Sequence, residues 1–155
     1  MTVLKRLRIA ASFYGDFRTR KDECDIFPGI DDVIKGLKNA GYKLAIFSNN
    51  KKSYVLEALR KHDLQGQFAS ILGFNEVSQT KPDPEGLLKI LEMEGISADK
   101  AIFIGDMVTD IKAGKAANVD TIAVASGLVA RPKLEVESPT KVVANTQELK
   151  TILGV

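Results

Sequence analysis

The chain has 155 residues, of which 45% are hydrophobic and 27% charged, a mixture typical of one globular domain. Its single cysteine, Cys24, excludes an internal disulfide framework, and no apolar run approaches the roughly 20 residues that cross a bilayer. We therefore expect a cytoplasmic protein without a membrane partner. Residues 1–21 carry six basic side chains and one acidic one. No aromatic stacking pattern accompanies them, so we expect a solvated basic face and no nucleic-acid partner.

From residue 30 onward, helical and strand-like patterns alternate along the chain. Apolar spacing and capping residues predict helices at 31–40, 53–62, 83–95, 109–117 and 147–153. Short apolar runs predict strands at 43–48, 70–73 (weaker), 101–105, 121–125 and, at an edge, 141–144. The stretch 127–139, which contains two prolines, is expected to be rich in loops. This alternation predicts an α/β fold with helices on both faces of a mainly parallel sheet.

Polar side chains follow three of the predicted strands. Ser48 and Asn49 end the strand at 43–48, Lys81 precedes the helix at 83–95, and Asp106 and Asp110 follow the strand at 101–105. Ligands of such sheets bind at the carboxyl ends of the strands. A hydroxyl, an ammonium and two carboxylates at this edge suit Mg²⁺ together with a phosphoryl group. Each residue also has a simpler interpretation, as a helix cap or a surface lysine, but their order and spacing favour a shared site.

Four segments carry a family resemblance. The chain is similar to the haloacid dehalogenase superfamily of phosphatases, in particular to its phosphoglycolate-phosphatase-like branch, over residues 26–155. The matching segments are Phe27-Pro28-Gly29-Ile30, the run 41–50 that ends in Phe47-Ser48-Asn49-Asn50, Lys81-Pro82-Asp83-Pro84 and Gly105-Asp106-Met107-Val108-Thr109-Asp110-Ile111. The resemblance implies a Rossmann-like three-layer core at 26–155, with the family's cap domain absent or reduced to an N-terminal helix.

The resemblance also implies roles for the polar residues at the strand ends. Ser48 and Asn49 would bind the phosphoryl group. Lys81 would neutralise both this group and the nucleophile, which is a catalytic role. Asp106 would bind Mg²⁺, and Asp110 would support the metal indirectly and take part in catalysis. The substrate would be a small phosphorylated metabolite, hydrolysed as a phosphomonoester.

The family's first motif, Asp-x-Asp-Gly-Thr, is missing from this sequence. In the family its first aspartate attacks phosphorus to form an aspartyl phosphate, and its second acts as the general acid and base. We therefore expect a phosphatase by lineage that is inactive as this chain alone. There are two alternatives. The chain is a non-catalytic binding or regulatory module, or it is one part of a split or truncated enzyme.

Residues 1–25 have two interpretations. In the first they are a remnant of the cap, because apolar residues recur at helical spacing and the charges of Lys5, Arg6 and Arg8 suit a buried strand poorly. In the second, residues 8–13 are a degenerate first strand, and Tyr14 replaces the nucleophile while Asp16 keeps the acid/base position. An empty central slot would leave strand backbone unpaired, which supports the second. We favour the first, with the slot filled by another segment, by self-association or by a second chain.

Overall fold

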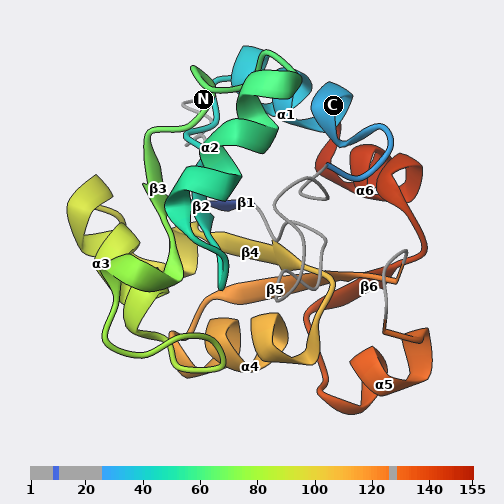
Figure 1. The fold of residues 1–155 in the computed structure, drawn as a ribbon. Coiled ribbons are helices and arrows are strands. Elements are labelled where there is room, and N and C mark those ends of the chain that lie inside the picture. Colours follow the sequence, from blue (N-terminus) through green and yellow to red (C-terminus); the bar gives the residue numbers. More distant parts are fainter. Residues whose placement is uncertain (1–8, 11–25, 126–128) are drawn as a thin grey trace, which may run out of the picture.

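The structure is a computed structural model that describes residues 9–10, 26–125 and 129–155 (Figure 1). The helices are α1 (Ile30–Asn39), α2 (Lys52–Lys61), α3 (Glu85–Glu94), α4 (Val108–Ala116), α5 (Arg131–Val136) and α6 (Thr146–Leu153). The strands are β1 (Ile9–Ala10), β2 (Ala45–Phe47), β3 (Ser70–Leu72), β4 (Ile102–Gly105), β5 (Asp120–Val124) and β6 (Lys141–Val143). Among these helices, none is both long enough and apolar enough to cross a membrane.

Every strand pairing in the described residues is parallel. Four strands form a sheet in the order β1-β4-β5-β6, and β2 pairs with β3. Figure 1 shows β1 between β2 and β4, so the two groups of strands lie side by side. The predicted α/β fold with a parallel sheet is confirmed, and β6 is an edge strand as expected.

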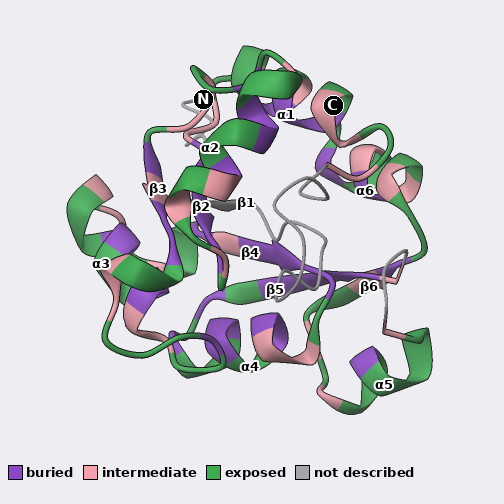
Figure 2. Cartoon of the chain, viewed as in Figure 1, coloured by how far each residue is buried: buried purple, intermediate pink, exposed green. Residues whose placement is uncertain are grey.

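The sheet is covered on both faces, which makes three layers. Side chains of successive strand residues point to opposite faces. Ile46 and Ile104 accordingly pack with α1, α2 and α6, whereas Phe47 and Phe103 pack with α3 and the C-terminal part of α4. Figure 2 shows β2 and most of β4 and β5 buried, and the helices buried mainly where they face the sheet. The continuous apolar runs of these strands follow from this double coverage.

The segment 127–139 differs from its prediction as a loop. It contains α5, whose first turn includes Pro132. Proline fits the first turn of a helix because its missing N–H has no intrahelical partner there. Leu134 is fully buried and packs with Ile111 of α4 and Ala123 of β5. The expectation of a loop-rich stretch misses this helix, because a six-residue helix with one buried leucine leaves no apolar periodicity in the sequence.

The N-terminal segment contributes one described element. In β1, Ile9 pairs with Phe103 and Ala10 with Ile104 of β4. A degenerate first strand over 8–13 would pair in this way. The rest of 1–25, with Tyr14 and Asp16, lies outside the described residues, so the assignment of this segment stays a prediction.

Candidate functional site

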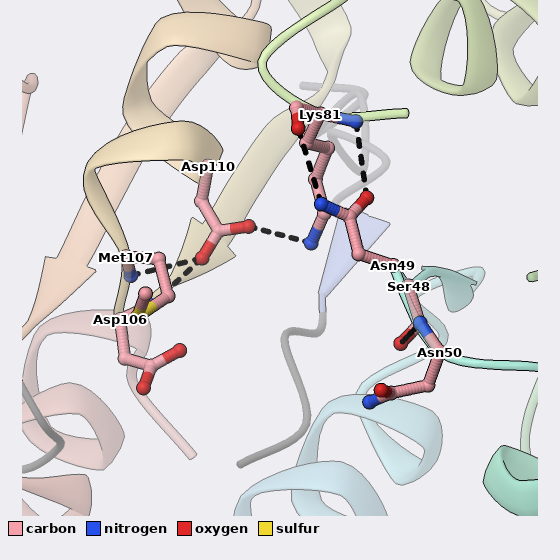
Figure 3. Close-up of polar contacts among 7 residues, drawn as sticks. All are labelled: Ser48, Asn49, Asn50, Lys81, Asp106, Met107 and Asp110. Atoms are coloured by element: carbon pink, nitrogen blue, oxygen red, sulfur yellow. Dashed lines mark hydrogen bonds and ion pairs between the residues drawn. The ribbon is translucent and has the colours of Figure 1, made fainter. Parts of the chain in front are cut away.

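Three loops meet at the carboxyl edge of the sheet, each following a parallel strand. Ser48 and Asn49 follow β2, Lys81 lies between β3 and α3, and Asp106 and Asp110 follow β4. Figure 3 shows that hydrogen bonds link the loop of Asn49 to Lys81 and Lys81 to Asp110. The sheet therefore brings together five of the six predicted site residues, since Asp16 lies outside the described residues.

A buried ion pair lies at the centre of the site. Lys81 Nζ is 2.6 Å from Asp110 Oδ1, and the two side chains are 4% and 2% exposed. Removing two charges from water is costly unless hydrogen bonds satisfy the remaining polar atoms. Asp110 meets this condition, because its Oδ2 accepts from the backbone N–H groups of Asp106 at 3.1 Å and Met107 at 3.0 Å.

The same carboxylate caps α4. Asp110 lies in the first turn of this helix, where backbone N–H groups have no intrahelical partner and a negative charge is favoured. Gly105 makes the arrangement sterically feasible, because a Cβ at this position would collide with the Asp110 carboxylate. The glycine that ends β4 is therefore required by the close approach of the aspartate.

The Lys81 ammonium lies over two aromatic rings. Its Nζ lies 5.5 Å from the centroid of the Phe47 ring and 5.6 Å from that of Phe103. Ring faces at this distance attract a cation. With the rings and Asp110 around it, the ammonium is held in one place.

Ser48 and Asn49 have different surroundings. Ser48 is buried, its N–H continues the β2–β3 pairing by donating to Leu72 O at 2.9 Å, and its Oγ accepts from the N–H of Asn50 at 3.1 Å. Asn49 is exposed, but its side-chain amide is hydrogen-bonded to the backbone of Lys81. The hydroxyl lies at the strand end, and its role as a donor to an anion stays a prediction.

Asp106 is the residue that fits a direct ligand of Mg²⁺. It is 2% exposed, and Figure 3 shows its carboxylate turned away from Asp110. Both oxygens of Asp110 are hydrogen-bonded, so Asp110 suits an indirect role. The described residues contain no group of three or more histidine, cysteine, aspartate or glutamate side chains that could hold a metal. Mg²⁺ commonly binds through one or two carboxylates, with waters and substrate phosphate supplying other ligands, so one carboxylate is compatible with it.

Two glutamates that the sequence analysis did not single out brace the loops of the site. Glu76 accepts from Gly73 N–H at 3.0 Å and from Lys52 Nζ at 2.9 Å. Burial raises the pKa of Glu76, but these two partners outweigh it and leave the pKa below its ordinary value. This holds the loop after β3 against the loop after β2, where Phe74 N–H donates to Asn50 O at 3.0 Å.

Glu85 braces the loop before Lys81. Its two oxygens accept from the N–H groups of Ser78 and Gln79, each at 2.8 Å. The hydrogen bond from Ser78 is the main reason that the pKa of Glu85 lies below its ordinary value. In the sequence, a glutamate in the first turn of the predicted helix indicates a helix start. It does not indicate hydrogen bonds to the preceding loop.

Comparison with known proteins identifies a family. The model of the haloacid dehalogenase-like hydrolase family matches residues 5–124. Phosphoglycolate phosphatase 1 of Pseudomonas aeruginosa is 34% identical over 125 residues, which are 81% of this chain and 46% of the relative. A phosphoglycolate phosphatase of Psychrobacter arcticus is 37% identical over 101 residues, 65% of this chain and 44% of the relative. The chain thus spans about half the length of the curated relatives it matches.

A solved structure agrees with this likeness. The crystal structure of a Lactobacillus delbrueckii subsp. bulgaricus protein, assigned as a phosphoglycolate phosphatase, has 31% sequence identity to this chain and a TM-score of 0.75. The match covers 87% of this chain and 58% of that one. The three-layer arrangement described above is therefore also that of an experimentally determined protein.

Proposed function

Because the chain belongs to the haloacid dehalogenase-like hydrolase family, we propose that it carries the phosphate- and magnesium-binding side of a Mg²⁺-dependent phosphomonoesterase. The observation that carries the proposal is the buried Lys81–Asp110 pair, held where the three strand-end loops meet. A buried cation at the same edge of the sheet as a strand-end hydroxyl is suited to a phosphoryl group, which has several negatively charged oxygens. The relatives' names make phosphoglycolate the first substrate to test among small phosphorylated metabolites.

Each side chain has a distinct role in this proposal. The Ser48 hydroxyl donates to a phosphoryl oxygen, and Asn49 belongs to the same phosphate-binding loop. Lys81 neutralises the phosphoryl charge, while Asp110 holds the ammonium in place. Asp106 would hold Mg²⁺, which supplies further neutralisation of the phosphoryl oxygens when bound.

The missing first motif limits what this chain does by itself. Phosphoryl transfer through an aspartyl phosphate needs an aspartate whose oxygen attacks phosphorus and a second group that protonates the leaving oxygen. The sequence lacks the Asp-x-Asp-Gly-Thr motif that supplies both, and Asp16 is the remaining candidate for the second. We therefore expect no turnover by this chain alone. This absence favours a second candidate function, a non-catalytic phosphate-binding module or one part of a split enzyme.

The compartment and partners belong to the same proposal. A lone cysteine fits a reducing compartment, and we assign the protein to the cytoplasm. The partners are a small phosphorylated metabolite and, in the split-enzyme case, a second chain or a second copy of this chain that supplies the missing nucleophile. No nucleic acid or membrane is expected among them.

Phosphate release from a panel of small phosphomonoesters, with and without Mg²⁺, tests the proposal. We expect no release, together with Mg²⁺-assisted binding of inorganic phosphate in a calorimetric titration. Asp106→Asn should remove the Mg²⁺ effect on binding. Release that needs Mg²⁺ and is lost in Asp106→Asn would show that a nucleophile exists, and Asp16→Asn would be examined next. If neither release nor phosphate binding is observed, the proposed function is wrong.

A further inference from the structure

The side chain of Asn49 connects two of the three loops. Asn49 Nδ2 donates to the backbone carbonyl of Lys81 at 3.1 Å, and the backbone N–H of Lys81 donates to Asn49 Oδ1 at 3.0 Å. These reciprocal bonds join residues 32 positions apart in the sequence. Figure 3 shows both bonds on the same side-chain amide. The amide of Asn49 therefore pairs with the peptide groups of Lys81 much as a neighbouring strand would.

Because of this pairing, the side-chain amide of Asn49 binds the protein backbone and is not available to a ligand. Its carbonyl oxygen and its NH₂ group each bind the Lys81 backbone, and an amide oxygen cannot donate a hydrogen bond to an anion. Rotating the side chain toward a phosphoryl group would break both bonds. The polar group that Asn49 can offer to phosphate without this loss is its own backbone N–H.

Lys81 depends on the position of its backbone. Its Nζ must reach Asp110 Oδ1 across the sheet edge while it stays over the rings of Phe47 and Phe103. The rings and the carboxylate fix the far end of the side chain, and Asn49 fixes the near end. A shift of the backbone by a fraction of an ångström would lengthen a hydrogen bond that is 2.6 Å long.

We infer that Asn49 is a positioning residue for Lys81, and that its side chain acts on phosphate only through that lysine. The inference rests on the proposed function for its phosphate-binding part. It assigns Asn49 a different task from Ser48, although the two are adjacent in the sequence. Ser48 would touch the phosphoryl group, whereas the Asn49 side chain would hold in place the cation that does.

The first test needs no ligand. In Asn49→Ala the backbone N–H of Lys81 loses its acceptor, so its hydrogen exchange, measured by NMR, should accelerate about tenfold, as expected for one hydrogen bond. The ammonium signal of Lys81 should also move toward that of an exposed lysine such as Lys35. Because Asn49 is exposed, the variant is expected to fold. Asn39→Ala, at an exposed position of α1, is the matched control and should change neither signal.

The second test is a double-mutant cycle read as the dissociation constant of inorganic phosphate with Mg²⁺ present. Asn49→Ala should weaken binding about fivefold to tenfold, and Lys81→Met about a hundredfold. If Asn49 acts through Lys81, adding Asn49→Ala to Lys81→Met should cause no further loss. Circular dichroism checks the fold of Lys81→Met. If that variant does not fold, Lys81→Gln, whose amide N–H can still donate to Asp110, replaces it in the cycle.

The two tests separate the inference from the proposed function. Equal losses on adding Asn49→Ala to the wild type and to the Lys81 variant would mean that Asn49 binds phosphate itself and would overturn the inference. Unchanged exchange and ammonium signals of Lys81 in Asn49→Ala would overturn it as well. If the wild-type chain binds no phosphate, the proposed function fails, and the two ligand-free signals still decide whether Asn49 positions Lys81.

Discussion

At the scale of single residues, the site is built from side chains that have two tasks at once. Asp110 caps α4 and also holds the Lys81 ammonium. Ser48 continues the β2–β3 pairing through its backbone and presents a hydroxyl at the strand end. Because the same atoms support the fold and the chemistry, substitutions here will affect stability and binding together, and only paired variants separate the two effects.

At Gly105 the fold and the site are linked by a steric constraint. In Gly105→Ala the new methyl group would collide with the Asp110 carboxylate, so the aspartate must leave its ion pair or the backbone must move. We expect the free energy of unfolding to fall by about 2 kcal/mol or more, as measured by urea denaturation. Gly66→Ala is the control, because a Cβ there has nothing within 4 Å. Equal stability of the two variants would contradict the close packing of Gly105 against Asp110.

At the scale of elements, polar contacts tie helices to the strands that they cover. Glu94 at the end of α3 accepts from the Ser70 hydroxyl of β3 and pairs with Lys43 Nζ at 3.0 Å, just before β2. These contacts join one helix to both strands of the β2–β3 pair. Neither can be anticipated from helical or strand periodicity, which describes one element at a time.

The Glu94 contacts predict a pH dependence. The hydrogen bond from Ser70, followed by the interaction with Lys43, lowers the pKa of Glu94 below its ordinary value of 4.5. A carboxyl with a lowered pKa in the folded state stabilises the fold above its ordinary pKa, and this contribution is lost as the pH falls through the folded-state value. Glu94→Gln should therefore reduce the free energy of unfolding by on the order of 1 kcal/mol near neutral pH.

In acid, the free energy of unfolding of Glu94→Gln should come closer to that of the wild type, because both proteins then carry an uncharged group at position 94. The check is urea denaturation of both proteins from pH ~7 down to pH ~3. Glu92→Gln, at an exposed position of the same helix, is the control. A difference between wild type and Glu94→Gln that stayed constant with pH would contradict an ionised Glu94 in the folded protein.

At the scale of the whole molecule, the helices and strands are predictable from sequence. The polar contacts of the site are predictable only in outline. Buried strands such as β4 and β5 are visible as apolar runs, and helix starts at capping residues such as Asp83 were found to within about two residues. The short helix α5 was missed because one buried leucine and a proline resemble a loop. The Asn49–Lys81 bonds could not be predicted, because only the folded sheet brings residues 32 positions apart together.

Ligand binding should also raise the stability of the whole folded chain. A ligand that binds only the folded state stabilises it by roughly 2.7 kcal/mol at a hundred times its Kd, which raises Tm by about 5–10 °C in a domain of this size. We expect phosphate and Mg²⁺ together to raise Tm more than either alone, as measured by calorimetry. The Mg²⁺-dependent part should vanish in Asp106→Asn, whose amide has lost the charge that a hard cation requires.

Phosphate also stabilises proteins by exclusion from their surface, without occupying a site. Ser48→Ala separates the two effects, because removing the buried hydroxyl weakens a site-bound anion but leaves the surface contribution unchanged. We therefore expect the Tm increase to be smaller in Ser48→Ala than in the wild type at every phosphate concentration. Equal increases in both proteins would mean that phosphate does not bind between Ser48, Lys81 and Asp106, and the buried ion pair would then serve the fold alone.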